Sequence, residues 1–331
     1  MKPVTSIKDF KGKKVLLRVD WNVPFEGGKV LDDSRILASV GTIEYILNNN
    51  GKIILMSHFG REGDSMDPVF EYAKNKFPIL DSGVEFLPNL RIDNREEDND
   101  ESFAKNIATK GDIYVNEAFS VSHRSHASIV GIPKFVKEKY AGVHFLKEVK
   151  GLSKSFNPPH PFLFILGGAK LETKIPLLEK FLNIADVVFV GGTLALPASK
   201  DEKLSTNPKI FFPLCDYSAL DADLPTVNLI LEKAKESKFV LWNGPLGKYE
   251  GGFVEGTKAL AQGLSELHEK GTAQPSHEAT AGTEVIVGGG DTLSAIKELN
   301  IEDKFTFVST AGGAMLDFLA NGTLPGIEAL K

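Results

Sequence analysis

The sequence predicts an α/β fold of two doubly wound parallel-sheet (Rossmann-like) lobes joined by a hinge helix. Apolar strand-like runs alternate with amphipathic helical segments along most of the chain, which is the pattern of parallel sheets covered by helices on both faces. A segment that ends in consecutive prolines divides this alternation near its middle. With 331 residues, the chain is long enough for two domains that each bury a core.

In the first half, the apolar run at 15–20 (VLLRVD) predicts a buried strand. A helix is expected at 34–48, because apolar residues recur there at helical spacing. Its expected inner face comprises Ile36, Leu37, Val40, Ile43 and Leu47. Further strands are expected at 53–58, 84–87 and 113–119, and a further helix at 101–109.

The lobe boundary is marked by proline. An amphipathic segment at 143–156 is followed by Asn157, Pro158 and Pro159, and proline both ends a helix and stiffens the chain. The expected division is an N-terminal lobe at 1–142, a connecting helix at 143–159, a C-terminal lobe at 160–320 and a tail at 321–331.

The C-terminal lobe repeats strand, turn and helix five times. The strand-like runs are FLFIL, VVFV, FVLW, EVIV and FTFVS, and glycine-rich turns follow them. Small residues after a strand let backbone N–H groups and a helix N-terminus approach a phosphate. Residues 268–282 are polar and rich in breakers, so an exposed loop is expected there.

In the N-terminal lobe, arginine side chains rather than glycine-rich turns suggest an anion site. All six arginines precede residue 125: Arg18, Arg35, Arg61, Arg91, Arg95 and Arg124. Polar residues stand at or just past strand ends, namely Asp20, Asn22, Arg35, His58, Arg61, Arg91 and 123–126 (HRSH). A single exposed arginine is most often a solvated charge, but strand ends converge in a doubly wound sheet. The set predicts a pocket for a small, multiply anionic substrate.

Three segments of the C-terminal lobe suggest a second anion site. Lys170 and Lys174 follow a Gly-Gly turn, where they could form an exposed helix face or reach nucleotide phosphates. Asp291, in GGGDT, could be a helix cap or a Mg²⁺ ligand beside phosphates. TAGGA at 310–314 aims backbone N–H groups at an anion. Two phosphorylated ligands that meet in a cleft would suit both lobes.

Composition excludes several classes of protein. The net charge of −6 argues against broad binding to nucleic acid or anionic membranes, and no apolar stretch is long enough to cross a bilayer. The single cysteine, Cys215, excludes an internal disulfide and a cysteine-based zinc cluster. We expect a soluble cytoplasmic protein with small-molecule partners.

The absence of familiar sequence motifs excludes further classes of protein. The P-loop pattern and the dinucleotide fingerprint are both absent. His123 and His126 could pair on a metal, but no third ligand is evident and Arg124 would repel a cation. Orienting a carboxylate, or packing, suits this histidine pair better.

Ten segments stand in order along the chain: RVDWNVP, DDSRI, SHFGR, LPNLR, VNEAF-SVSHRSHAS, ILGGAKLETK, WNGPLGKYE, VGGGDT, STAGGA and LPGIEAL. This ordered set resembles the phosphoglycerate kinase family from about residue 13 to the C-terminus. The resemblance implies reversible transfer of the acyl phosphate of 1,3-bisphosphoglycerate to Mg-ADP, giving 3-phosphoglycerate and ATP. It also implies a monomer, a hinge at 143–159 and a tail that returns to the lobe junction.

The resemblance implies roles residue by residue. The catalytic groups would be Arg35, Lys170 and the backbone of Gly312 and Gly313. The phosphoglycerate site would comprise Asp20, Trp21, Asn22, Arg35, His58, Phe59, Gly60, Arg61, Arg91 and Arg124. The nucleotide site would comprise Lys170, Lys174, Gly192, Asn243, Glu250, Gly289, Gly290, Asp291 and Thr292, with Glu250 on the ribose and Asp291 on Mg²⁺.

The chain departs from the family's pattern in several places. It is shorter after Arg61 and between Gly192 and Pro225, and Thr193 and Ala311 stand where the family has glycine. A methyl group is tolerated at such positions unless φ is positive. A non-catalytic binding protein with a weakened nucleotide site is therefore the alternative. Strand–glycine turns alone leave a nicotinamide-dependent oxidoreductase as a weaker one.

Overall fold

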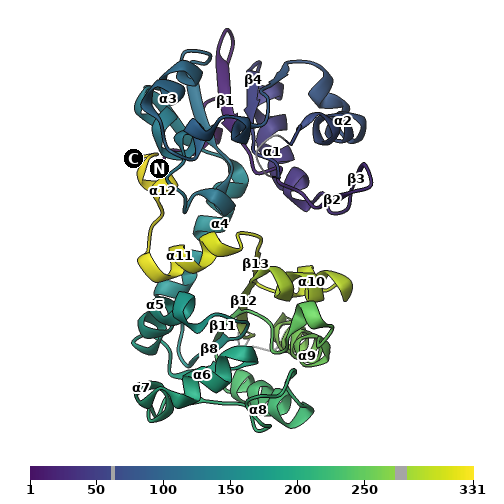
Figure 1. The fold of residues 1–331 in the computed structure, drawn as a ribbon, viewed down its shortest axis with the longest axis vertical. Helices are drawn as coiled ribbons and strands as arrows, with labels where there is room; N and C mark the ends of the chain where they lie inside the picture. Colours follow the sequence, from purple (N-terminus) through teal and green to yellow (C-terminus); the bar gives the residue numbers. More distant parts are fainter. Residues whose placement is uncertain (61–63, 273–281) are drawn as a thin grey trace. The chain divides into compact units, whose positions relative to one another are not determined.

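The computed structural model describes residues 1–60, 64–272 and 282–331. The chain forms two compact units: the first is Met1–Lys150 with Thr323–Lys331, and the second is Gly151–Gly322. Each unit is a parallel sheet with helices on both of its faces (Figure 1). The predicted fold class is confirmed.

Five parallel strands form the sheet of the first unit, in the order β5-β4-β1-β6-β7. Their bounds are Lys14–Arg18 (β1), Lys52–Met56 (β4), Val84–Phe86 (β5), Ile113–Asn116 (β6) and Glu138–Ala141 (β7). The central strands are nearly continuous apolar runs because helices cover both faces of the sheet. A short hairpin, Phe25–Glu26 (β2) with Lys29–Val30 (β3), follows β1.

Helices α1 (Ser34–Asn48) and α2 (Asp67–Lys76) pack on one face of this sheet and α3 (Glu101–Ala108) on the other (Figure 1). The predicted inner face of α1 is partly wrong: Ile36 and Ile43 are buried, but Leu37 is 48% exposed. The face is rotated because two polar residues lie inside. Ser39 accepts a hydrogen bond from the Trp21 indole at 2.9 Å, and Thr42 bonds a buried carboxylate.

That carboxylate, Glu117, fixes the start of helix α4 (Val143–Ser153). It follows β6 and accepts hydrogen bonds from the backbone N–H groups of His144 and Phe145, each at 2.9 Å. Thr42 donates to Glu117 at 2.6 Å and accepts from the Val143 N–H at 2.8 Å. Three N–H groups that a helix leaves unpaired at its start are thereby satisfied.

The chain ends in the first unit with a short helix, α12 (Pro325–Glu328). The Gly326 N–H donates to the Ser122 carbonyl at 2.9 Å. A Cβ at Gly326 would lie 2.6 Å from the Ser122 side chain, so glycine permits this close approach.

Six parallel strands form the sheet of the second unit, in the order β10-β9-β8-β11-β12-β13. Their bounds are Phe162–Leu166 (β8), Val187–Val190 (β9), Ile210–Phe211 (β10), Phe239–Asn243 (β11), Glu284–Gly288 (β12) and Phe307–Ser309 (β13). The five predicted strands are confirmed. The two-residue edge strand β10 was not predicted.

Helices α8 (Leu224–Lys235), α9 (Glu255–Thr272) and α10 (Gly290–Glu298) cover one face of this sheet, and α5 (Leu171–Leu182) and α11 (Gly313–Asn321) the other (Figure 1). Two shorter helices, α6 (Ala195–Lys200) and α7 (Glu202–Ser205), precede β10. The loop predicted at 268–282 is wrong for its first residues, because α9 continues to Thr272. The first strong helix breaker there is Gly271, and residues 273–281 lie outside the described part of the chain.

None of the helices in the described ranges is long and apolar enough to cross a lipid bilayer.

Candidate ligand sites at the strand ends

In the first unit, strand register brings the predicted polar segments to one edge of the sheet. Arg18, the last residue of β1, is opposite Met56 of β4 and Asn116 of β6. The segments 19–22, 57–60 and 117–120 therefore leave the sheet side by side, at the carboxyl ends of parallel strands. In open α/β sheets this edge is where ligands bind.

Asp20 organises the cations at this edge. Its carboxylate lies 3.1 Å from Arg35 Nη1 and accepts a hydrogen bond from Ser120. Arg35 Nη1 also donates to the Asn22 carbonyl at 2.8 Å, while the Asn22 side chain accepts from the Gly60 N–H at 2.9 Å. Burial opposes ionisation of Asp20, but the charges of Arg35 and Arg18 and the hydrogen bond from Ser120 favour it, and its pKa is lowered. Arg35 keeps 40% of its side chain exposed, so its remaining donors can meet a ligand.

His58 lies beside this cluster and is only 3% exposed. Its Nε2 is 3.9 Å from Asp20 Oδ1, beyond hydrogen-bond distance, and its Nδ1 is 3.1 Å from Arg18 Nη2. Burial, reinforced by the charge of Arg18, holds the pKa of His58 well below its usual range. The imidazole is therefore neutral at pH 7.

The other predicted arginines differ in position. Arg91 Nη1 donates to the Gly60 carbonyl at 2.9 Å, and Arg91 Nε lies 2.9 Å from Glu97 Oε1. Its side chain is 15% exposed, so Arg91 belongs to the wall of the same edge. Arg124 is exposed, and Arg61 lies outside the described residues.

Trp21 and Phe59 have their side chains in the core. The Trp21 ring is fully buried, and its backbone N–H donates to Ser57 at 2.9 Å. Phe59 is 9% exposed and packs against Phe25 at a ring-centroid distance of 5.7 Å. Any contact of these two residues with a ligand would therefore involve their backbone.

A buried polar network behind His58 was missed from the sequence. Arg18 is 1% exposed and Glu96 has no exposed surface. Ser128 joins them: it accepts from Arg18 Nε at 2.7 Å, and both its N–H and its hydroxyl donate to Glu96. The only signal in the sequence is a charged residue inside the apolar run VLLRVD.

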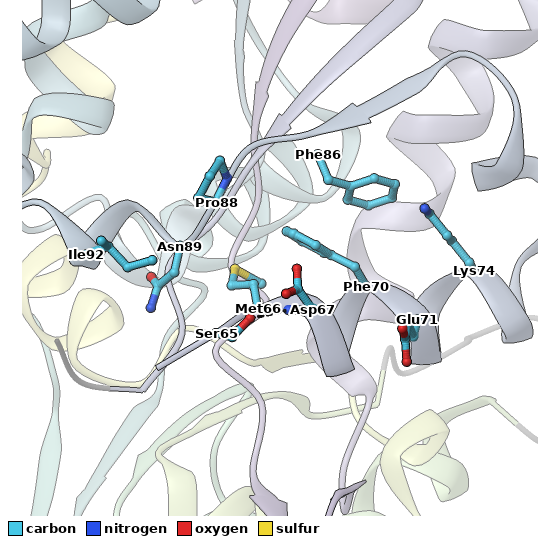
Figure 2. A pocket seen from close by; sticks show the side chains of 10 residues that line it. All are labelled: Ser65, Met66, Asp67, Phe70, Glu71, Lys74, Phe86, Pro88, Asn89 and Ile92. Atoms are coloured by element: carbon cyan, nitrogen blue, oxygen red, sulfur yellow. Dashed lines mark hydrogen bonds between the residues drawn. The ribbon is translucent and has the colours of Figure 1, made fainter. Parts of the chain in front are cut away.

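Two cavities lie close to this edge. One, of about 490 Å³, is lined by Asn22, Gly60, Asp64 and Ser65 together with apolar side chains. The other, of about 450 Å³, lies between α2 and residues 86–92, where Phe70 and Phe86 form an aromatic wall and Lys74 stands at one end (Figure 2). No predicted site residue lines the second cavity.

In the second unit, the strand register places the turns that follow the strands at one edge of the sheet. Leu166 of β8 is opposite Asn243 of β11, which is opposite Gly288 of β12, and Ser309 of β13 follows in line. Positive φ angles occur at Gly168, Gly192, Gly244, Gly289 and Gly312 in the turns that follow. The backbone is packed closely here. A Cβ at Gly192 would lie 2.8 Å from both the Gly168 nitrogen and the Pro245 oxygen. This edge therefore presents backbone rather than side chains to a ligand.

The two predicted lysines are placed differently. Lys170 is exposed and caps α5 in a left-handed conformation, with φ of 62°. Lys174 is 7% exposed and donates to the Gly167 carbonyl, with Asn243 Oδ1 at 3.5 Å. Burial lowers the pKa of Lys174 to about 8, and Asp291 opposes this shift. Lys174, Asn243 and Asp291 thus lie within electrostatic reach of one another.

Asp291 is in the first turn of α10, whose cap is Gly289 without a side-chain hydrogen bond. It is therefore not the helix cap. Burial raises the pKa of Asp291, and the nearby charge of Glu250 adds to this, while Lys174 opposes it. Thr292 is fully buried, and its hydroxyl has no hydrogen-bond partner among the described residues. Gly290, at the start of α10, is exposed.

The two positions where glycine is replaced carry no backbone strain. Neither Thr193 nor Ala311 has a positive φ. The Thr193 hydroxyl donates to the Gly168 carbonyl at 3.0 Å, and Ala311 is 2% exposed. Gly312, with φ of 56°, caps α11 and Gly313 begins it. These replacements leave the glycine turns beside them intact.

The histidine pair at 123–126 does not gather metal ligands. Burial lowers the pKa of His126 to about 4, and Arg124 is among the neighbouring cations that add to this. Within residues 1–60, 64–272 and 282–331, no group of three or more histidine, cysteine, aspartate or glutamate side chains could hold a metal ion.

Comparisons with known proteins agree on one family. The family model described as phosphoglycerate kinase matches residues 4–79, 69–211 and 198–322. A phosphoglycerate kinase of Chloroherpeton thalassium is 34% identical over 97% of this chain and 97% of its own length. One of Fervidobacterium nodosum is 33% identical over 97% and 96%.

Solved structures give the same result. The phosphoglycerate kinase of Coxiella burnetii has a TM-score of 0.83 at 28% identity and covers 99% of this chain and 98% of that one. That of Pyrococcus horikoshii has a TM-score of 0.81 at 24% identity, which bears on the fold alone. The alignment to the Chloroherpeton protein runs over 396 positions, so at least 65 of them have no counterpart among the 331 residues of this chain. The chain is a shortened relative, yet α2 and β5 still occupy the interval after Arg61.

Proposed function

The chain belongs to the phosphoglycerate kinase family, and from this premise we propose that it reversibly transfers the acyl phosphate of 1,3-bisphosphoglycerate to ADP, giving 3-phosphoglycerate and ATP. The reported relatives are all kinases, which favours this function over a non-catalytic binding role. The acceptor in the ATP-consuming direction would be the carboxylate of 3-phosphoglycerate.

One observation carries the proposal: each unit gathers anion-binding groups of a different kind at one edge of its sheet. In the first unit, Arg35 keeps free donors beside Asn22 and His58, which suits a small anion with several oxygens. In the second, glycine turns and the starts of α5, α10 and α11 present backbone N–H groups and lysine, which suits nucleotide phosphates.

The chemistry requires no proton transfer by the protein. An anionic phosphate oxygen of ADP attacks the acyl phosphorus, its new P–O bond forms as the acyl P–O bond breaks, and the leaving group is a carboxylate. The step needs positive charge and N–H donors around the migrating PO₃ group. We assign this role to Arg35, Lys170 and the amides of Gly312 and Gly313.

The donor set of the second unit also fits a divalent cation. Asp291 has a raised pKa beside Glu250, so a nearby cation would relieve the repulsion between the two carboxylates. Mg²⁺ bound to a nucleotide needs only one or two protein carboxylates. Asp291 would hold it, and it would neutralise phosphate charge.

Water would hydrolyse the acyl phosphate, so direct transfer needs a centre from which water is excluded. We propose that the protein opens to bind and closes to react, with residues 143–159 as the hinge, and that it acts as a monomer in the cytoplasm. Glu250 would hold the ribose hydroxyls of the nucleotide.

A coupled assay tests the function directly: ATP-dependent phosphorylation of 3-phosphoglycerate is followed through a reductive step that consumes the acyl phosphate. We expect turnover that requires both substrates and Mg²⁺. Calorimetry with Mg-ADP and with 3-phosphoglycerate identifies the alternative. If both ligands bind but no product forms, the chain is a binding protein and the proposal is wrong.

A further inference from the structure

Among the arginines that the structure describes, Arg18 is the one whose side chain is almost completely inside the protein. It is 1% exposed, and all three guanidinium nitrogens already have partners. Nε donates to Ser128 at 2.7 Å, Nη1 donates to the Val19 carbonyl, and Nη2 contacts His58 Nδ1 at 3.1 Å. A guanidinium group enclosed in this way cannot contact a ligand directly. Any effect of Arg18 on a bound anion must therefore be transmitted by His58.

The contact with His58 determines where the imidazole proton lies. A guanidinium has donors and no acceptor, so His58 Nδ1 must accept the hydrogen bond from Arg18. A neutral imidazole with an acceptor at Nδ1 carries its proton on Nε2. No other described residue accepts from Nε2, since Asp20 Oδ1 is 3.9 Å away. The Nε2–H group therefore remains available at the edge where Arg35 and Asn22 lie.

A second layer holds Arg18 in this position. Glu96 is fully buried and supplies the opposite charge, and Ser128 connects it to Arg18 through hydrogen bonds on both sides. The Tyr114 hydroxyl donates to the Ser128 carbonyl at 2.7 Å and fixes the serine backbone. The arrangement is satisfied in hydrogen bonds, as a buried charge pair must be to persist.

We propose that Arg18 is a positioning residue that holds His58 as the Nε2–H tautomer, so that His58 offers one neutral hydrogen-bond donor to an oxygen of bound phosphoglycerate. The identity of the ligand rests on the proposed function, whereas the tautomer does not. Neutrality suits this place, because a protonated His58 would face the charge of Arg18 directly.

The first test uses the unchanged chain. Long-range ¹H–¹⁵N correlation of ¹⁵N-histidine protein at pH 7 distinguishes a protonated ring nitrogen from an unprotonated one, and the variant His58→Gln identifies the His58 signals among the seven histidines. We expect a proton on Nε2 and none on Nδ1. A proton on Nδ1, or on both nitrogens, overturns the inference even if no variant folds.

The second test separates positioning from bulk stability. Arg18→Met alone would leave Glu96 as an unpaired buried charge, so it is combined with Glu96→Gln, and Glu96→Gln alone is the matched control. In the control, Arg18 still donates to His58, and the tautomer stays. In the double variant, we expect a mixture of tautomers and a KM for 3-phosphoglycerate raised by the inverse of the Nε2–H fraction, about twofold for an equal mixture, with kcat little changed.

An unchanged tautomer in the folded double variant would refute the role of Arg18. The proposed function and the role assigned to Arg18 can also be refuted independently of each other. An inactive chain with the Nε2–H tautomer refutes the proposed function and leaves the assignment of Arg18 in place. An active chain with the Nδ1–H tautomer does the reverse.

Discussion

Replacement of Glu117 by glutamine should make the first unit less sensitive to pH. The side chain of Glu117 is 4% exposed and lies between Thr42 and the first turn of α4. Burial raises its pKa to about 7, against the pull of the donors from Thr42, Phe145 and His144. Glutamine keeps the size of the side chain and removes the ionisation.

The sign and the size of this pH effect on the unfolding free energy follow from the shift in the pKa of Glu117. Because the folded pKa of Glu117 lies above its ordinary value of 4.5, the folded state retains the proton more tightly than the unfolded state. The stabilisation is complete below pH 4.5 and is lost as pH rises through 7. At about 1.4 kcal/mol per pKa unit, the loss is about 3 kcal/mol. Relative to Glu117→Gln, the wild-type chain should lose this amount of unfolding free energy between pH 4 and pH 8.

The two tryptophans allow each unit to be followed separately, since Trp21 is in the core of the first and Trp242 in the core of the second. With Trp242→Phe as the background, urea unfolding is followed by Trp21 fluorescence at several pH values, with and without Glu117→Gln. Subtracting the unfolding free energies of the two chains removes the contributions of all other titrating groups. A difference that is flat with pH would show that the three donors balance burial, and one that grows in favour of wild type as pH rises would show that they outweigh it; either result contradicts the prediction.

Two further predictions concern the second unit. The affinity for Mg-ADP should fall as pH rises through about 8, by up to about tenfold per pH unit, because Lys174 then loses its proton; calorimetry should find no such step in Lys174→Met, and a step that persists there would assign it to another group. Gly192→Ala should weaken Mg-ADP binding about tenfold, since φ is 61° and the new Cβ meets backbone atoms at 2.8 Å. Thr193→Gly is its control and should bind normally, because Thr193 has no positive φ; equal losses in both variants would contradict the steric explanation.

The sequence was most informative where strands are buried on both faces. Continuous apolar runs located β1, β4 and β8, because such strands cannot alternate polar and apolar residues. The edge strands β7 and β10 were missed: β7 is the mixed tetrapeptide EKYA, and β10 has only two residues. Neither β7 nor β10 has a continuous run of buried apolar residues, whereas the edge strands β5 and β13 were predicted.

The grouping of polar residues in the candidate site was predictable where these residues follow strands, and not where they pair within the core. Asp20 and His58 follow β1 and β4 in the sequence, and register brings these strand ends together, while Arg35 lies in the first turn of α1. Arg18, Glu96 and Glu117 are charged residues whose partners lie far along the chain, as with Arg18 and Ser128 at a separation of 110 residues. Such pairings have no sequence period. The inner face of α1 was misjudged for the same reason, since Ser39 and Thr42 are buried through hydrogen bonds.

We propose that Arg35 and Lys170 both stabilise the migrating phosphoryl group. Single-turnover phosphoryl transfer is therefore measured for Arg35→Lys and Lys170→Met, with saturating ligands. Each variant should lose at least about 100-fold in rate, as for the loss of one preorganised donor, while Arg35→Lys still binds Mg-ADP normally and Lys170→Met still binds 3-phosphoglycerate normally. A wild-type transfer rate in either variant would remove that residue from the reaction and contradict the account.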